Sequence, residues 1–182
     1  GAGKRVFTTS SSPGVALMQE GISYMAGAEV PGVIVNVQRG GPGLGTIQPS
    51  QGDYFQATRG GGNGDYNVIV LAPASVQEMA DFVDLAFELA FRYRTPTMIL
   101  SDGIIGQMME KVVLPPMKPR LTDEEIIKRY PWATTGRKKD RQPNIITSLE
   151  LSSEVMERRN IALQKKYRQI EESEVRFETD RK

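Results

Sequence analysis

The sequence contains no cysteine and no histidine. Thiolate and imidazole chemistry is therefore excluded from this chain, and with it zinc fingers, iron–sulfur ligation and a catalytic triad that uses histidine. We expect neither a catalytic residue of those kinds nor a metal site on the chain. The absence of cysteine also fits a reducing compartment, so we expect a cytoplasmic protein.

Long apolar runs and an excess of one charge are missing too. No stretch is long enough to span a bilayer, and the start has no signal-peptide pattern. The 23 lysine and arginine residues nearly balance the 22 aspartate and glutamate residues, so composition predicts no nucleic-acid or membrane partner. The first residue is glycine, and we interpret the chain as a piece of a longer protein, cut at both ends.

The chain is instead rich in glycine between residues 33 and 53. This stretch opens with the run V-I-V-N-V (residues 33–37), which is typical of a strand buried on both faces. Arg39 follows, and residues 40–45 then contain four glycines and one proline. A glycine-rich loop at the carboxyl end of a central parallel strand is where open α/β sheets bind their ligands.

Strand-like and helix-like segments alternate along the first two thirds of the chain. We expect strands at residues 4–9, 33–37, 68–71 and 97–100, and helices at residues 15–25, 49–57 and 76–94. Ser75 with Glu78 predicts a capping box at the start of the third helix. This order predicts a doubly wound, mostly parallel α/β sheet in residues 1–114.

The proline-rich run at residues 114–119 ends this alternation, because proline lacks an amide hydrogen and fixes φ. Residues 115–182 are predicted to form a helical extension that links to a following domain. It holds a short helix at 122–130, capped by Thr122 and Glu125, and a long helix at about 149–174 with heptad-spaced apolar residues. We expect the long helix to dock on the α/β domain or on a partner rather than to form a free coiled coil.

Three common glycine motifs are disfavoured. No Lys-Ser or Lys-Thr pair follows the first glycine loop, which argues against a P-loop, and the spacing fits a dinucleotide fingerprint poorly. Arg39 and Arg59 each begin an Arg-Gly-Gly triplet, but both lie between predicted strands without flanking repeats, unlike RNA-binding boxes. The second glycine loop, residues 60–64, has either a tight-turn or a ligand role.

Five short motifs, in order, resemble the alpha subunit of the thiamine-diphosphate-dependent 2-oxoacid:ferredoxin oxidoreductases, most closely the 2-oxoisovalerate and 2-oxoglutarate members. The motifs are T-T-S-S-S-P-G (8–14), R-G-G-P-G with Q-G-D (39–43 and 51–53), L-A-P-A-S-V-Q-E (71–78), Y-R-T-P (93–96) and L-S-D (100–102). The spacing of residues 157–176 also matches the link to that family's next domain.

The resemblance implies a fold and a set of partners. The chain would be the pyrimidine-type thiamine-binding domain, paired with a beta subunit that holds the diphosphate and its Mg²⁺, and with further small subunits. The reaction would be oxidative decarboxylation of a 2-oxoacid to its acyl-coenzyme A, with electrons passing through iron–sulfur clusters on partner chains to ferredoxin. The family's activating glutamate and its Tyr-Pro-Ile-Thr-Pro segment lie upstream of the position matching Gly1, so we expect no catalytic residue in this stretch and little activity from it alone.

The resemblance also assigns candidate site residues. Arg39 matches the arginine that faces the substrate carboxylate, which suits a guanidinium fork; the alternative is a structural ion pair with a carboxylate such as Asp53. The loop that approaches the thiamine pyrimidine would be Ser11, Ser12, Pro13 and Gly14, or these residues would only cap a helix. Gly40 and Gly41 would allow the backbone to approach the site closely.

Three further residues bear on the prediction. Leu44 and Ile47 stand where other members often carry polar residues or proline, which leaves the preferred 2-oxoacid open. For Asp102 we favour a role in capping its own turn. Two other functions stay open: a non-catalytic module for subunit assembly, and a domain of another thiamine-diphosphate enzyme.

Overall fold

Strand β2 (Gly32–Gln38) lies inside a four-stranded sheet. In the computed structural model, which describes residues 1–136 and 142–177, β2 pairs in parallel with β1 (Phe7–Ser10) on one side and with β4 (Pro96–Asp102) on the other. Strand β3 (Ile69–Leu71) pairs in parallel with β4, so the strand order is β1-β2-β4-β3. The predicted central, doubly buried strand and the parallel sheet are confirmed.

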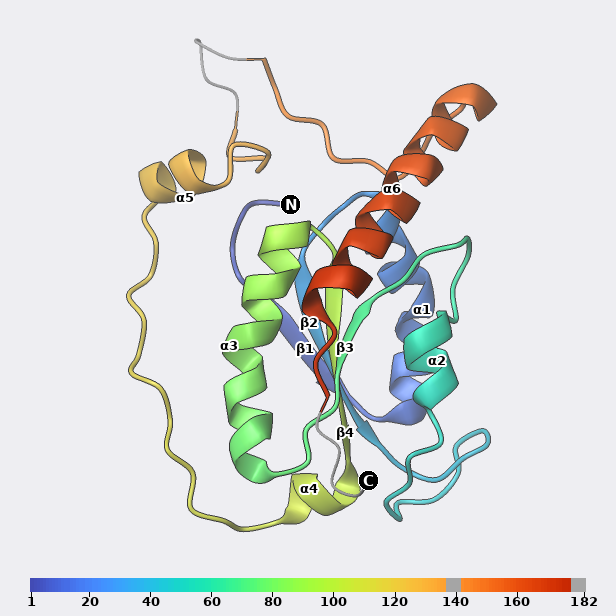
Figure 1. Ribbon diagram of the computed structural model, residues 1–182, viewed down its shortest axis with the longest axis vertical. Helices are drawn as coiled ribbons and strands as arrows, with labels where there is room; N and C mark the ends of the chain where they lie inside the picture. The colour runs from blue at the N-terminus through green and yellow to red at the C-terminus, as the bar shows by residue number, and fades with distance from the viewer. Residues whose placement is uncertain (137–141, 178–182) are drawn as a thin grey trace. The chain divides into compact units, whose positions relative to one another are not determined.

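Helices cover both faces of this sheet because the side chains of β2 and β4 alternate between two cores. Val33, Val35 and Ile99 pack in the core formed by α3 (Val76–Tyr93), whereas Ile34 and Met98 pack in the core formed by α1 (Ser12–Gly27). Helix α2 (Tyr54–Arg59) adds Ala57 to the α1 side. Figure 1 shows α3 on one side of the strands and α1 with α2 on the other, which is the predicted doubly wound arrangement.

The predicted caps form, with one difference. The Ser75 side chain accepts a hydrogen bond from the Glu78 amide at 3.1 Å, but the Glu78 carboxylate accepts from the Ala74 amide rather than from that of Ser75. The prediction that the Glu78 carboxylate accepts the Ser75 amide is therefore wrong, because the amide it accepts belongs to the preceding residue. Helix α5 (Asp123–Arg129) has both halves of its box, between Thr122 and Glu125.

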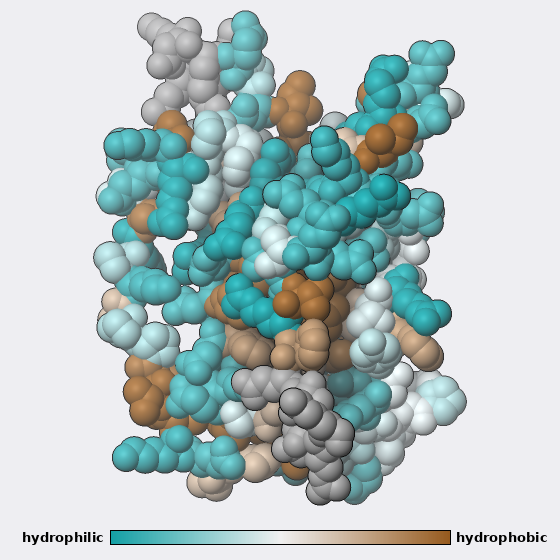
Figure 2. All heavy atoms as spheres, in the orientation of Figure 1, coloured by the Kyte–Doolittle hydropathy of each residue, from teal (hydrophilic) through white to brown (hydrophobic). Residues whose placement is uncertain are grey.

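After β4, the short helix α4 (Gly103–Gln107) leads into an extended segment that reaches α5. The proline-rich run lies in this segment and has no regular structure, as predicted. Figure 2 shows apolar residues at the surface of this segment. Its large exposed apolar side chains include those of Met109, Val113, Leu114 and Met117.

The chain divides into two compact units, Gly1–Ser148 and Leu149–Lys182. The second unit is built on α6 (Ser153–Glu174), where the Ser152 side chain caps the Val155 amide. Leu149 therefore precedes the helix that we expected it to begin. The boundary between residues 114 and 115 and the docking of the long helix stay predictions. Within residues 1–136 and 142–177, no helix combines the length and the apolar character needed to cross a membrane.

Candidate functional site

Three segments come together at one edge of the sheet because its strands are parallel. The turn between β1 and α1, the loop after β2 and the start of α4 all follow the carboxyl ends of neighbouring strands. Open α/β sheets bind ligands at this edge. All seven predicted site residues lie on the first two of these segments.

The first segment is the turn at residues 10–14, which begins α1. The Ser11 carbonyl accepts the Gly14 amide at 2.7 Å, and Ser11 is the N-cap residue without a side-chain cap. A Cβ at Gly14 would lie 2.0 Å from the Ser10 hydroxyl oxygen, so a larger residue there would require that hydroxyl to rotate away. Ser11, Pro13 and Gly14 keep part of their surface accessible.

Ser12 ties the two segments together. Its hydroxyl accepts the Arg39 amide at 3.0 Å and donates to the Arg39 carbonyl at 3.2 Å. Its own amide donates to the Asn36 side chain at 3.0 Å, and the residue is buried. The predicted thiamine-facing turn therefore lies directly beside the predicted substrate-binding residue, and the Ser12 hydroxyl is occupied in holding them together.

Arg39 stands at the end of β2, half buried, with its guanidinium beside the following loop. Its Nη1 donates to the Thr46 carbonyl at 3.4 Å, a long hydrogen bond. Asp53, the carboxylate that could have paired with it, accepts instead from the Asn36 amide nitrogen at 2.9 Å. Among the described residues no carboxylate forms an ion pair with Arg39, so the alternative interpretation as a structural ion pair with Asp53 is wrong.

The loop after Arg39 is folded on itself. The Gly40 amide donates to the Gln48 carbonyl at 2.9 Å, and the Gly40 carbonyl accepts the Thr46 amide at 2.8 Å. Gly45 has φ +62°, and a Cβ there would lie 1.9 Å from the Gly40 oxygen, so this position requires glycine. Leu44 and Ile47 project from the loop with 80% and 81% of their surface exposed.

Pattern reasoning missed two residues of this edge, Asn36 and Gln38. Asn36 is fully buried in β2, where its amide accepts from Ser12 and donates to Asp53. The Gln38 side chain accepts the Asp53 amide at 2.9 Å. The signal was present in the sequence, since an asparagine inside an otherwise apolar buried strand has to be hydrogen-bonded.

Asp102 caps α4, as predicted. Its Oδ1 accepts the amides of Ile104 and Ile105 at 2.9 and 3.0 Å, and its Oδ2 accepts the Gln51 amide nitrogen at 2.8 Å. The hydrogen bond from Gln51, then those from the two backbone amides, lower the pKa of Asp102 against the opposing effect of burial. The carboxylate therefore fastens the loop after β2 to the start of α4.

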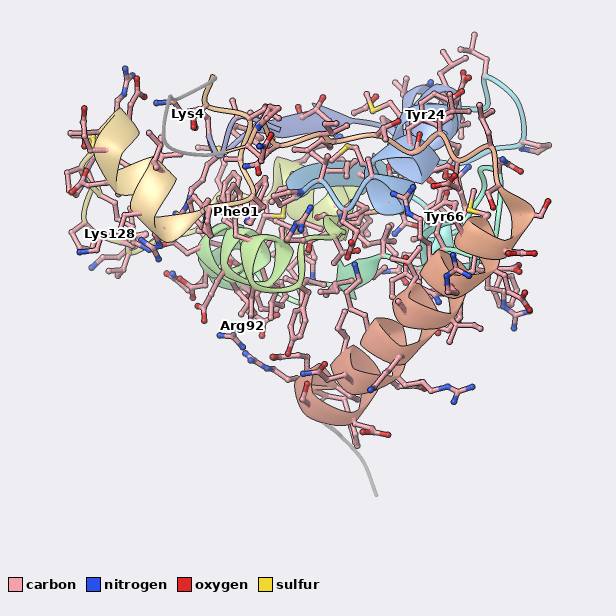
Figure 3. The ribbon with its side chains drawn as sticks, turned by 90° about the horizontal axis from the view of Figure 1, so that it is seen from above. Lys4, Tyr24, Tyr66, Phe91, Arg92 and Lys128 are labelled. Atoms are coloured by element: carbon pink, nitrogen blue, oxygen red, sulfur yellow. The ribbon has the colours of Figure 1, made fainter. Side chains whose placement is uncertain are left out.

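The second glycine loop packs against α1. The Tyr66 hydroxyl accepts the amides of Gly61 and Gly62 and donates to the Gln19 side chain at 3.1 Å. Figure 3 labels Tyr66, which lies beside α1. A Cβ at Gly62 would lie 2.5 Å from the Gln19 carbonyl oxygen, so close packing explains this glycine. These contacts favour the tight-turn role for residues 60–64.

The fold defines a class: a doubly wound α/β domain whose first helix turn and glycine-rich loop lie together at the carboxyl edge of its parallel sheet. Residues 1–175 match the family described as pyruvate flavodoxin/ferredoxin oxidoreductase, thiamine-diphosphate-binding. The chain belongs to this family, and the resemblance read from its motifs is confirmed.

Named relatives agree with this assignment. The chain is 50% identical over 180 residues to the ketoisovalerate oxidoreductase subunit VorB of Methanothermobacter thermautotrophicus, covering 97% of this chain and 49% of that protein. It is 52% identical over 117 residues to the 2-oxoglutarate synthase subunit KorA of Archaeoglobus fulgidus, covering 64% of this chain and 34% of that protein. The chain thus spans about half the length, or less, of these relatives.

A solved structure shares the fold. It is the 2-oxoglutarate:ferredoxin oxidoreductase from Magnetococcus marinus with 2-oxoglutarate, coenzyme A and succinyl-CoA bound. The TM-score is 0.62 at 28% sequence identity, and the match covers 92% of this chain and 34% of that one. The α/β fold predicted from the sequence is confirmed by this match.

Proposed function

We propose that this chain forms the thiamine-pyrimidine side of the active site of a 2-oxoacid:ferredoxin oxidoreductase. The enzyme would convert a 2-oxoacid to its acyl-coenzyme A by oxidative decarboxylation and pass the electrons to ferredoxin. The family match over residues 1–175 and the relatives named for ketoisovalerate and 2-oxoglutarate support this proposal.

The observation that carries the proposal is the state of Arg39. Its guanidinium lies at the ligand-binding edge of the sheet with one long hydrogen bond to a carbonyl, while the neighbouring Asp53 is held by Asn36. A half-buried permanent cation without a carboxylate partner among the described residues is suited to bind an anion. We assign it the carboxylate of the 2-oxoacid, which matches the guanidinium fork.

The residues beside Arg39 suit the pyrimidine end of thiamine diphosphate better than its diphosphate end. Accessible here are Ser11, Pro13 and Gly14 of the helix turn and the backbone of Gly40 and Gly41, where a Cβ at Gly41 would meet nothing within 4 Å. The described residues hold no cluster of three or more acidic or other metal-ligating side chains. Hence the diphosphate and its Mg²⁺ would bind on the beta subunit. The iron–sulfur clusters would lie on partner chains, since cluster ligands are chiefly cysteines.

When bound, thiamine diphosphate supplies stabilisation of the carbanion left by decarboxylation. This chain would position the reactants. Ser12 holds the helix turn against Arg39, Asn36 holds both the turn and Asp53, and Gly45 lets the loop close on Gly40. Arg39 would fix the substrate carboxylate, and with it the orientation of the 2-oxo group.

The side chains of Leu44 and Ile47 bear on which 2-oxoacid is preferred. They flank Thr46, whose carbonyl contacts the Arg39 guanidinium, and both are apolar and exposed. A substrate held through its carboxylate by Arg39 would place its own side chain near them. We propose that they favour the branched apolar chain of 2-oxoisovalerate over the second carboxylate of 2-oxoglutarate.

The test uses the full-length alpha subunit assembled with its beta partner, and measures coenzyme A-dependent dye reduction with several 2-oxoacids. Loss of a charged hydrogen bond costs about 1.5–3 kcal/mol, so Arg39→Ala should lower kcat/KM by about 10- to 150-fold. Arg39→Lys should recover only part of this, because lysine lacks the fork. Arg59→Ala is the matched control, since Arg59 is an exposed arginine whose guanidinium lies over the Phe55 ring.

Unchanged kinetics in Arg39→Ala would refute the assignment of Arg39. The specificity proposal has its own readout: Leu44→Ser and Ile47→Ser should each lower the preference for 2-oxoisovalerate over 2-oxoglutarate by about tenfold. If both variants kept the wild-type ratio of kcat/KM for the two substrates, Leu44 and Ile47 would not contact the substrate. The assignment of Arg39 would be unaffected.

A second candidate function is subunit assembly, which the exposed apolar residues at the β1 edge favour. Phe7 in β1 and Val6 just before it are 60% and 65% exposed, and β1 pairs on one side within the described sheet. Leu17 and Tyr24 of α1 are exposed as well. Such surfaces commonly contact partners.

Deleting residues 150–182 tests the long helix separately: loss of beta-subunit binding would assign it to assembly, and retained binding would exclude that role.

A further inference from the structure

A second concave site lies at the opposite edge of the sheet. A cavity of about 780 Å³ is lined by residues from the segment before β1, from the extended segment before α5 and from α5 itself. Its lining residues are Lys4, Arg5, Lys118, Pro119, Arg120, Leu121, Ile126 and Arg129. Lys4 and Arg5 precede β1, so the cavity lies on the side of the strands' amino ends. Figure 3 shows Lys4 near α5.

The cavity carries a surplus of positive charge. Five of its eight lining residues are lysine or arginine. Asp84 pairs with Lys118 at 2.9 Å and with Arg5 at 3.8 Å, and Asp123 pairs with Lys4 at 2.8 Å. Among the described residues, three of these five cations form ion pairs, with two carboxylates between them, so the five positive charges exceed their paired negative charges by three.

The unmatched charge lies mainly on two arginines. No carboxylate among the described residues pairs with Arg120, and Arg129 has only the ring of Tyr130 under its guanidinium, at 5.7 Å. Arg5 is held over the Phe87 ring as well as beside Asp84. The cavity therefore has two guanidinium groups free to bind, beside three cations already fixed in place.

The remaining lining is apolar. Pro119, Leu121 and the buried Ile126 line the cavity between the cationic side chains. The volume lies in the range of pockets for small organic ligands and is far larger than one inorganic anion needs. Several cations around an apolar surface suit a molecule that has both phosphate groups and a flat apolar part.

We propose that this cavity binds a nucleoside diphosphate. Arg120 and Arg129 bind the diphosphate oxygens through their forks, because guanidinium matches phosphate geometry bidentately. Lys4 and Lys118 add positive potential from the rim, and Pro119 with Leu121 contacts the base. This site is separate from the edge that holds Arg39 and does not depend on the proposed oxidoreductase function.

The test is titration calorimetry of the 182-residue chain with ADP, pyrophosphate and adenosine as probes. ADP should bind more tightly than pyrophosphate, and adenosine should bind more weakly than either. Arg120→Ala and Arg129→Ala should each weaken ADP binding at least tenfold, and Arg129→Lys by less. Both arginines are exposed, so the variants should retain the wild-type circular dichroism spectrum. The matched control is Arg59→Ala, an exposed arginine outside the cavity, which should bind ADP within twofold of wild type.

Absence of ADP binding would overturn the proposal. So would equal ADP affinities in the Arg129→Ala and Arg59→Ala variants, because binding would then be general electrostatic attraction. If pyrophosphate bound as tightly as ADP, the apolar lining would have no role and the nucleoside part of the proposal would be wrong. Loss of beta-subunit binding in Arg120→Ala, without any ADP binding by the wild type, would reassign the cavity to a protein partner.

Discussion

Replacing Asn36 with alanine should destabilise the chain because this side chain joins three segments from inside the sheet. It is fully buried, accepts the Ser12 amide at 3.0 Å and donates to the Asp53 carboxylate at 2.9 Å. Alanine keeps the strand but removes both bonds. The Ser12 amide then stays buried without its acceptor, and the Asp53 carboxylate loses its hydrogen bond from Asn36.

The magnitude follows from these two losses. A buried amide without a partner costs about 1–3 kcal/mol, and the hydrogen bond to Asp53 contributes about 1 kcal/mol after allowance for its partial exposure to water. We therefore expect Asn36→Ala to lower the free energy of unfolding by about 3 kcal/mol. For a chain of 182 residues this corresponds to a fall in Tm of roughly 6–12 °C.

Urea denaturation followed by circular dichroism measures this difference. Asn67→Ala is the matched control, since Asn67 is exposed on a loop and should stay within about 0.5 kcal/mol of wild type. A loss below about 0.5 kcal/mol in Asn36→Ala would refute the reasoning that this amide holds the site together. If Asn36→Ala and Asn67→Ala lowered the free energy of unfolding equally, the loss would follow from replacing any asparagine and not from the hydrogen bonds of Asn36.

Two other predictions concern the same edge of the sheet. Gly45→Ala should unfold the loop after β2, because a Cβ at φ +62° would meet the Gly40 carbonyl. The rate of amide hydrogen exchange in residues 40–48 should therefore rise, and an unchanged rate would contradict the close contact. Asp102 has a pKa below its ordinary value of 3.8 in the folded chain, so its contribution to stability is present above that pH and is lost as the pH falls through the lower folded-state pKa. Asp102→Asn should therefore make the stability of the chain less sensitive to pH below about 4 in acid titrations, and an identical acid dependence would show that the carboxylate contributes nothing.

The sheet could be predicted because short runs of apolar and β-branched residues alternate with helical segments along residues 7–102. Residues 33–37 predict a strand buried on both faces, and β2 occupies that place between β1 and β4. Ends of elements were less certain. The helix expected from residue 49 starts at Tyr54, because residues 49–53 form the loop that Gln38 and Asn36 hold through Asp53.

Side-chain partners could not be predicted in the same way. The sequence left open whether Arg39 pairs with Asp53. The answer depends on a hydrogen bond from the Asn36 side chain to the Asp53 carboxylate, which joins residues 17 positions apart. The role of Ser12 depends on the distance between two loops 27 residues apart, which no local pattern encodes. The basic cavity was missed because its cations come from residues 4–5 and 118–129, which are distant in sequence and mixed with acidic residues.

The most direct test of the central claim is chemical rescue of Arg39→Ala in the assembled alpha–beta enzyme. If Arg39 binds the substrate carboxylate, added guanidinium ion should restore part of the lost kcat/KM for a 2-oxoacid, mainly by lowering KM. The same concentration should leave wild type and Arg59→Ala unchanged. An Arg39→Ala enzyme whose KM equals that of wild type, with or without guanidinium, would contradict the claim.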